Sequence, residues 1–98
     1  MNINARTSET SDLYMNVVAN PLHNLRIAVC RNGIQWLIQT RDGERHGAAR
    51  WATRAYAMTK PGVIEALRRF GGLSEHDAHA IAGQLPHKPQ SANGCCSE

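Results

Sequence analysis

Apolar and polar residues alternate with a period of two along residues 25–38, which is typical of two half-buried strands. One face carries the large apolar side chains, namely Leu25, Ile27, Val29, Ile34, Trp36 and Ile38. The opposite face carries Arg26, Gln35 and Gln39. Asn32-Gly33 between the two runs predicts a hairpin with a two-residue turn, in which Arg31 pairs with Ile34, Val29 with Trp36 and Ile27 with Ile38. A shift of one residue would expose the apolar face, so the register is well specified.

A second turn is expected at Asp42-Gly43, and the segment after it fits two patterns. The apolar residues between 48 and 58 can be read with helical spacing, but Trp51, Thr53 and Ala55 alternate as in a strand. Two strands alone are only marginally stable in water, so a third strand over about residues 50–57 is favoured. This strand would extend the apolar face and place Trp51 near Trp36.

Two helices are predicted after the strands. Thr59 is a candidate N-cap with Pro61 in the first turn, and Gly71-Gly72 ends that helix. Ser74 begins a second helix with an acidic first turn, which ends before Pro86. The side chains expected to face inward are Val63, Ile64, Leu67, Phe70, Ala78, Ile81, Ala82 and Leu85. The pattern therefore predicts an α+β domain, a three-stranded antiparallel β-meander followed by two helices, at least one of them packed on the sheet.

The 98 residues suffice for one domain, and the two ends differ in composition from the middle. Residues 1–21 are rich in Asn, Ser and Thr, and residues 87–98 have no large apolar side chain. Both ends are expected to be disordered or loosely attached, because they bury too little apolar surface to offset their ordering entropy. A domain over residues 22–86 remains, and a fragment of residues 21–87 should then unfold at nearly the same temperature. A domain this small gains from a partner or a second copy, so monomer and homodimer both stay open.

Charge is concentrated in the middle of the chain. Residues 24–72 hold nine of the eleven Arg and Lys residues but three of the eight Asp and Glu residues. The residues predicted to bind a partner are Arg41, Arg45, Arg50 and Arg54, with Trp51 between the last two. Arginine makes planar, forked contacts with phosphate and carboxylate, which suits such a surface. Arginine used in place of lysine by a GC-rich genome would give the same composition without a functional reason.

Candidate catalytic and metal-binding residues are few. His76 and His79 lie one turn apart on the second predicted helix, but zinc needs further ligands that no other His or Cys is placed to supply. No nucleophile motif with a neighbouring base is present, so no enzymatic activity, metal or cofactor is expected. Cys30 fits a buried position in a strand, and Cys95-Cys96 fits reduced thiols in the tail. No membrane span or signal peptide is recognisable, so a cytoplasmic protein is expected.

Residues 25–86 also carry a set of features in a fixed order. They are Trp36-Leu37-Ile38-Gln39, a basic turn, Arg50-Trp51, Tyr56, Thr59 before a helix, Glu65-Ala66-Leu67 and Leu85-Pro86. In these features the chain resembles a group of small proteins carried by prophages and integrative elements of proteobacteria. It departs from that group in a longer turn at 41–49 and in the alanines of the third strand. The resemblance transfers no activity, but mobile-element cargo of this size often includes inhibitors of host defence, anti-CRISPR proteins among them. This step is an analogy from genetic context.

Two functions follow as hypotheses. In the first, the protein is a non-enzymatic, anti-CRISPR-like inhibitor that docks through its Arg-rich surface on a host protein or ribonucleoprotein complex, such as a defence complex. In the second, it is a small basic nucleic-acid-binding regulator or accessory factor of a mobile element. Glu75-His76-Asp77 at the start of the second helix would repel a DNA backbone where a recognition helix should attract it. The first hypothesis is therefore favoured.

Overall fold

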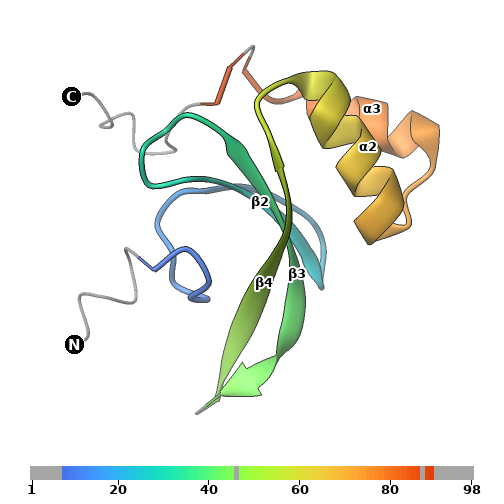
Figure 1. Cartoon of the computed structure of the whole chain (residues 1–98). Helices are drawn as coiled ribbons and strands as arrows, with labels where there is room; N and C mark the ends of the chain where they lie inside the picture. Colours follow the sequence, from blue (N-terminus) through green and yellow to red (C-terminus); the bar gives the residue numbers. More distant parts are fainter. Residues whose placement is uncertain (1–7, 46, 87, 90–98) are drawn as a thin grey trace.

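The computed structural model of the chain describes residues 8–45, 47–86 and 88–89. A four-stranded antiparallel sheet with strand order β1-β2-β3-β4 carries two helices on one face (Figure 1). The elements are β1 (Val17–Leu22), β2 (Leu25–Val29), β3 (Trp36–Arg45), β4 (Ala48–Ala57), α2 (Lys60–Gly71) and α3 (Glu75–Gly83). The α+β class is confirmed, and the predicted number of strands is too small by one.

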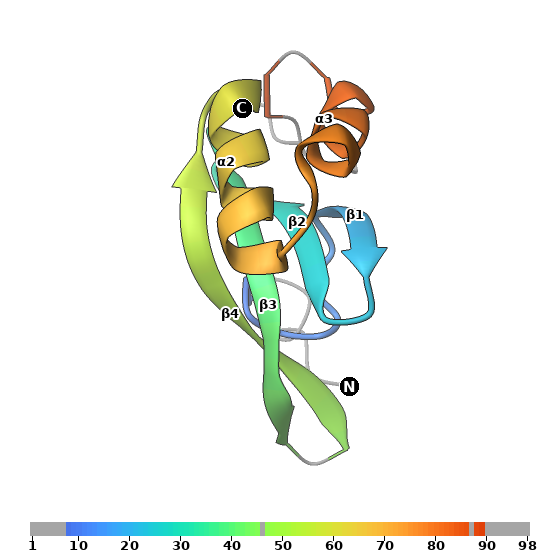
Figure 2. The ribbon, with the colours of Figure 1, turned by 90° about the vertical axis from the view of Figure 1, so that its right-hand side faces the viewer.

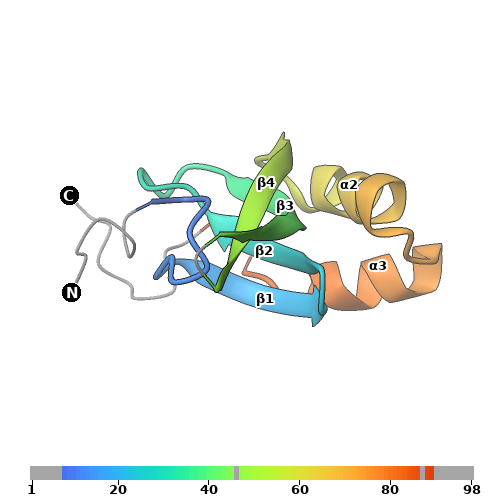
Figure 3. The same cartoon turned by 90° about the horizontal axis from the view of Figure 1, so that it is seen from below.

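The additional strand, β1, lies in the segment expected to be disordered. It pairs with β2, with Val17 opposite Ala28 and Leu22 opposite Leu25. Residues 8–16, which we call the strap, precede it and cross the sheet face that points away from the helices (Figures 1 and 3). The expectation for residues 1–21 is therefore wrong over residues 8–21. Residues 1–7 and most of the predicted tail 87–98 lie outside the described residues.

Two features of this N-terminal segment explain why the sequence pattern does not predict its structure. β1 contains two register irregularities, which interrupt the alternation of side chains between the faces. The strap is held by hydrogen bonds rather than by an apolar stripe: the Tyr14 hydroxyl donates to the Val29 carbonyl oxygen at 2.6 Å, and the Val29 amide donates to the Asn16 carbonyl oxygen at 2.9 Å. A fragment of residues 21–87 lacks these contacts, and its thermal midpoint should therefore lie below that of the full chain.

The hairpin of β2 and β3 has the predicted register, with Val29 opposite Trp36 and Ile27 opposite Ile38. Its turn is longer than predicted. The Cys30 amide donates to the Gln35 carbonyl oxygen at 3.0 Å, which leaves a four-residue loop at 31–34. The predicted pairing of Arg31 with Ile34 is therefore wrong. Ile34, expected in the apolar face, is 60% exposed in this loop.

The predicted third strand is present as β4, but the turn before it is not at Asp42-Gly43. These two residues lie inside β3, where Arg41 pairs with Trp51 and Glu44 with Ala49, so β3 has one extra residue between the two pairs. Gly43 takes a φ of 91°, which a bulge of this kind favours. β3 and β4 thus continue as a two-stranded ribbon beyond the end of α2 (Figure 2). We call its outer part, residues 41–45 and 48–50, the β3–β4 arm.

A second bulge reverses the side of the sheet on which Trp51 lies. Ile38 pairs with Ala55, but the next residue of β3, Gln39, pairs with Thr53, so β4 has one extra residue here. Side chains alternate along a strand, and an extra residue therefore moves all later side chains to the other face. Trp51 consequently lies on the strap side of the sheet while Trp36 faces the helices. The expectation that the two tryptophans are close is wrong.

The main core lies between the sheet and the two helices. Its large side chains are Leu25, Ile27, Val29, Trp36 and Ile38 from the sheet, and Val63, Leu67 and Leu85 from the helical part. Both predicted N-caps are confirmed, because the Thr59 hydroxyl accepts from the Gly62 amide and the Ser74 hydroxyl from the Asp77 amide. Phe70, expected to face inward, is 38% exposed at the edge of α2.

Replacing Trp36, which is fully buried, tests this core. We expect Trp36→Ala to lower the free energy of unfolding by about 3–5 kcal/mol, because a large cavity would open between sheet and helices. Chemical denaturation followed by circular dichroism measures the loss, and Ile34→Ala in the exposed loop serves as a control with a change below about 0.5 kcal/mol. Similar small losses in both variants would contradict the assigned core.

Candidate docking surface

The residues predicted to bind a partner, which are Arg41, Arg45, Arg50, Arg54 and Trp51, do not form one surface. Arg41 pairs across strands with Trp51, which is 5% exposed and lies on the strap side. The Arg54 guanidinium instead donates from Nε to the Thr40 hydroxyl at 2.8 Å. Because Thr40 and Arg41 are neighbours in a strand, their side chains point to opposite faces. The cluster is therefore divided between the two sides of the sheet, and the side chain of Arg45 is outside the described part.

Arg41 is engaged locally. Its Nη2 lies 3.1 Å from the Glu44 Oε2, and its Nη1 lies 3.3 Å from the Nε2 of His23 in the β1–β2 turn. The carboxylate offsets the charge of the guanidinium, and the exposed pair itself contributes little to stability. Arg50 and Arg54 are both exposed on β4. Their described contacts include no acidic side chain, unlike those of Arg41.

Trp51 is a structural residue. The Arg26 guanidinium carbon lies 4.4 Å from the centroid of its ring, a cation–π arrangement. Its indole Nε1 donates to the Asp12 carboxylate of the strap at 3.0 Å. A partner would reach this ring only after displacing the strap, so the proposed role of Trp51 in binding is not supported by its position.

Arg26 is the centre of a polar network under the strap. It is 2% exposed, donates from Nε to the Gln39 Oε1 at 2.7 Å, and donates from Nη2 to the carbonyl oxygens of Glu9 and Ser11 at 3.2 and 2.8 Å. Gln39 in turn donates to the Glu9 carbonyl oxygen at 2.7 Å. Burial lowers the pKa of Arg26 to about 10, because a charged group is disfavoured away from water. Alternation alone predicted that Arg26 and Gln39 share a face, and nothing in the alternation indicated that this face is covered.

The hydrogen-bonding directions along β4 follow from those of β3. The Arg41 amide donates to the Asn24 carbonyl oxygen at 3.0 Å and therefore points toward β2. Alternate residues of a strand point to opposite sides, so the intervening residues of β3 bond to β4. Their partners in β4 are Ala52, Ala55 and Ala57. Thr53 and Tyr56, which lie between them, direct their backbone N–H and C=O groups to the outer edge of the sheet.

The outer edge of β4 is occupied at one end and open at the other. Ser11 forms an antiparallel bridge with Arg50, and the Trp51 amide donates to the Thr10 carbonyl oxygen at 3.1 Å. Farther along, the described residues provide no backbone partner for the outward groups of Thr53 and Tyr56. An open edge of this kind can accept another strand.

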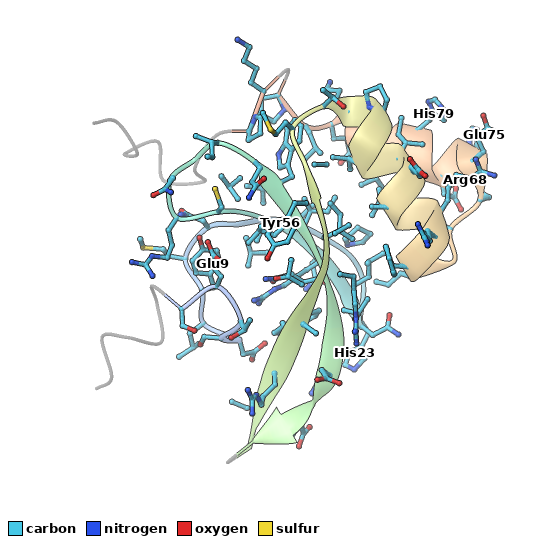
Figure 4. The ribbon with its side chains drawn as sticks, viewed as in Figure 1. Glu9, His23, Tyr56, Arg68, Glu75 and His79 are labelled. Carbon is cyan, nitrogen blue, oxygen red and sulfur yellow. The ribbon has the colours of Figure 1, made fainter. Side chains whose placement is uncertain are left out.

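Exposed aromatic side chains lie on both sides of this open edge. Tyr56 is 62% exposed and stands opposite Leu37, whose side chain packs with Tyr14 of the strap, so Tyr56 lies on the strap side (Figure 4). On the helix side, Ala55 and Phe70 line a groove of about 220 Å³, which Tyr56 also borders. The β4 edge surface, as we call it, consists of Arg50, Arg54, Ala55, Tyr56, Arg69 and Phe70.

The charge of this surface is predominantly positive. The Arg69 guanidinium lies 5.5 Å from the centroid of the Phe70 ring, and both residues line the groove together with Glu65. The groove thus combines Arg69 and Glu65 with an aromatic ring, and Arg50 and Arg54 of β4 add two exposed cations to the surface. A surface of this composition suits an acidic protein segment, since charges at the rim steer association and an apolar centre provides burial.

Other candidate groups lie apart from this surface. Glu75 and His79 approach to 3.8 Å on α3 (Figure 4), and across the described ranges no three His, Cys, Asp or Glu side chains gather closely enough to hold a metal ion. Cys30 is a buried free thiol, and Cys95-Cys96 falls outside the described residues. No helix in the described part of the chain is long and apolar enough to cross a membrane.

No protein-family model, curated protein or solved structure matches this chain.

Tyr14 offers a test of how firmly the strap is held. Burial raises the pKa of its hydroxyl, which donates to the Val29 carbonyl oxygen. We expect Tyr14→Phe to lower the free energy of unfolding by about 1–2 kcal/mol at pH 7. Above pH ~10 the unfolded chain loses this proton while the folded protein retains it, so the wild type loses stability and the difference from the variant shrinks. Denaturant unfolding at pH 7 and pH 10.5 measures both quantities; a difference independent of pH would contradict a buried hydroxyl.

Proposed function

We propose that the protein is a non-enzymatic binding protein that docks on an acidic surface of a protein partner through its β4 edge surface. One observation carries the proposal: Arg50 and Arg54, exposed and without an acidic neighbour among the described contacts, lie along the same edge as the outward backbone groups of β4. Tyr56 and Phe70 add exposed aromatic area at that edge. Aromatic and arginine side chains are the types that contribute most to protein interfaces.

The partner that we propose is a complex of bacterial host defence, bound in the cytoplasm of that host. This identity derives from the resemblance of residues 25–86 to cargo proteins of mobile elements, and binding would inhibit the complex. Docking on a protein is supported by the geometry of the β4 edge surface. The identity of that protein is supported only by the resemblance.

A second candidate function, nucleic-acid binding, is favoured by the shape of the β3–β4 arm. A two-stranded ribbon fits the major groove of B-DNA, and this arm projects beyond the helices with Arg41 and Arg50 on it (Figure 2). Asp42 and Glu44 lie on the same arm, and Glu44 already pairs with Arg41. These carboxylates would repel a phosphate backbone, so we prefer the protein partner.

Reversing the two exposed arginines of β4 tests the docking surface. We expect Arg50→Glu with Arg54→Glu to reduce capture of the partner from nuclease-treated host lysate by at least about tenfold, since attraction to acidic groups becomes repulsion. The control is Arg68→Glu with Lys88→Glu, which makes the same change in net charge at exposed positions on α2 and after α3. Equal loss in both double variants would indicate a nonspecific charge effect, and undiminished capture by the first would contradict the proposal.

Salt dependence separates the two candidate functions. Binding to duplex DNA should weaken linearly in log affinity against log salt concentration, with a slope of about −0.9 for each phosphate neutralised. We expect random duplex and single-stranded oligonucleotides to bind weakly at physiological salt, and we expect a shallow slope for the captured protein partner. Fluorescence anisotropy at several salt concentrations measures both. Tight oligonucleotide binding with a steep slope would replace the proposed function by the nucleic-acid one.

A further inference from the structure

We propose that the partner contributes an extended acidic segment that pairs with the outer edge of β4 as an additional strand. This inference rests on the proposed function and specifies its binding mode. The outward N–H and C=O groups of Thr53 and Tyr56 provide two points of backbone pairing in the open stretch. Backbone pairing at a sheet edge supplies affinity, and side chains that alternate between the two faces supply specificity.

The chain itself already uses this edge for strand pairing. The strap meets β4 at Arg50 and Trp51 through an antiparallel bridge and a backbone hydrogen bond, so the edge has the geometry needed to accept an extended segment. The pairing stops there, because Glu9 turns onto the sheet face and its carbonyl oxygen accepts from Arg26 and Gln39. Among the described residues, none pairs with the stretch of β4 beyond Trp51, and this is the stretch that we assign to the partner.

The opposite edge of the sheet is protected by its own sequence. β1 contains Pro21, which lacks a backbone donor. A proline is typical of an edge that resists further strand pairing. The open stretch of β4, from Ala52 to Ala57, contains no proline. The two edges thus differ in the way expected if β4 alone accepts a strand.

Side chains of an added strand would meet different surroundings on the two faces. On the helix side, an apolar residue would enter the groove beside Ala55 and Phe70, and its neighbour two positions away in the direction of Thr53 would approach Arg54 and Arg69. On the strap side, the intervening residues would contact Tyr56. The segment that fits best therefore has a carboxylate two positions from an apolar residue, with a β-branched residue between them. A carboxylate on each side of the apolar residue offers this arrangement in either strand direction.

A second copy of this chain is a poorer occupant of the same edge. A symmetric antiparallel pairing of the two stretches from Ala52 to Ala57 would place the Arg54 side chains of both copies beside each other. Like charges in neighbouring positions of a sheet are destabilising. The positive charge of the β4 edge surface favours an acidic segment over a second copy.

A peptide of defined sequence tests the binding mode directly. The probe is the capped heptapeptide Thr-Glu-Val-Leu-Val-Glu-Thr, titrated into the full-length ¹⁵N-labelled protein and followed by NMR. We expect saturable binding below 1 mM, with protection of the Tyr56 amide from hydrogen exchange as the peptide binds. Absence of saturable binding at that concentration would overturn the inference, and the lysate capture that depends on Arg50 and Arg54 would still report on the proposed function separately.

Two variants at one position isolate the contribution of the backbone. Tyr56→Pro removes the outward N–H together with the side chain, whereas Tyr56→Ala removes the side chain and keeps the N–H. We expect the proline variant to bind the peptide at least about tenfold more weakly than the alanine variant, which corresponds to about 1.4 kcal/mol. Equal affinities would mean that docking uses side chains alone and would overturn the inference.

A modified peptide gives the same answer without altering the protein. N-methylation of alternate residues removes the donors on one edge of the peptide, in two versions that differ in which edge is blocked. We expect one version to lose binding by at least about tenfold and the other to bind like the unmodified peptide. Equal binding by both versions would overturn the inference even if the proline variant fails to fold.

Sedimentation of the free protein tests whether a second copy occupies the same edge. We expect a monomer. A dimer that Tyr56→Pro abolishes would assign the edge to a second copy and overturn the proposal of an acidic segment.

Discussion

The buried guanidinium of Arg26 determines which surfaces of this protein are available. A charged group on a sheet face must be hydrogen bonded if it is covered, and Gln39 together with two strap carbonyl oxygens meets that requirement. The Trp51 ring closes the site from the side. Because these contacts use backbone oxygens, the strap lies across the sheet in one position and reaches the β4 edge at Arg50. Along that edge, the residues that the structure describes provide no backbone partner beyond Trp51.

The sequence pattern predicted most of the helix-facing half of the fold. Alternation along residues 25–38 specified the register of β2 and β3, and the hydroxyls of Thr59 and Ser74 marked both helix starts. These features are local, because each depends on residues close in sequence or on a regular period. The strap and β1 depend instead on contacts between distant residues, such as Arg26 with Ser11, and on irregular pairing that removes the period. Composition alone made this segment resemble a disordered one.

The candidate site was predicted in part for the same reasons. Arg50 and Arg54 were selected from charge density, and they do lie exposed on one strand. Alternation alone places Trp51 on the face opposite to its neighbour Arg50. The bulge in β4 opposite Ile38 and Gln39 additionally places Arg41 on the other face, and no residue type in β4 indicates where an extra residue is inserted. Tyr56 and Phe70 were missed because the pattern makes aromatic residues candidates for the core, whereas an edge strand and the end of a helix leave them exposed. An open edge is a property of the complete sheet and has no signature in a single sequence.

Hydrogen exchange of the β4 amides in the free protein reports the direction and pairing of each N–H group, and so shows whether the edge of β4 is open. We expect slow exchange for Trp51, held by the strap, and for Ala52, Ala55 and Ala57, bonded to β3. We expect fast exchange for Thr53 and Tyr56, whose amides point to the open edge. Slow exchange at Tyr56 in the free monomer would mean that the edge is already occupied and that a partner strand has no place on it.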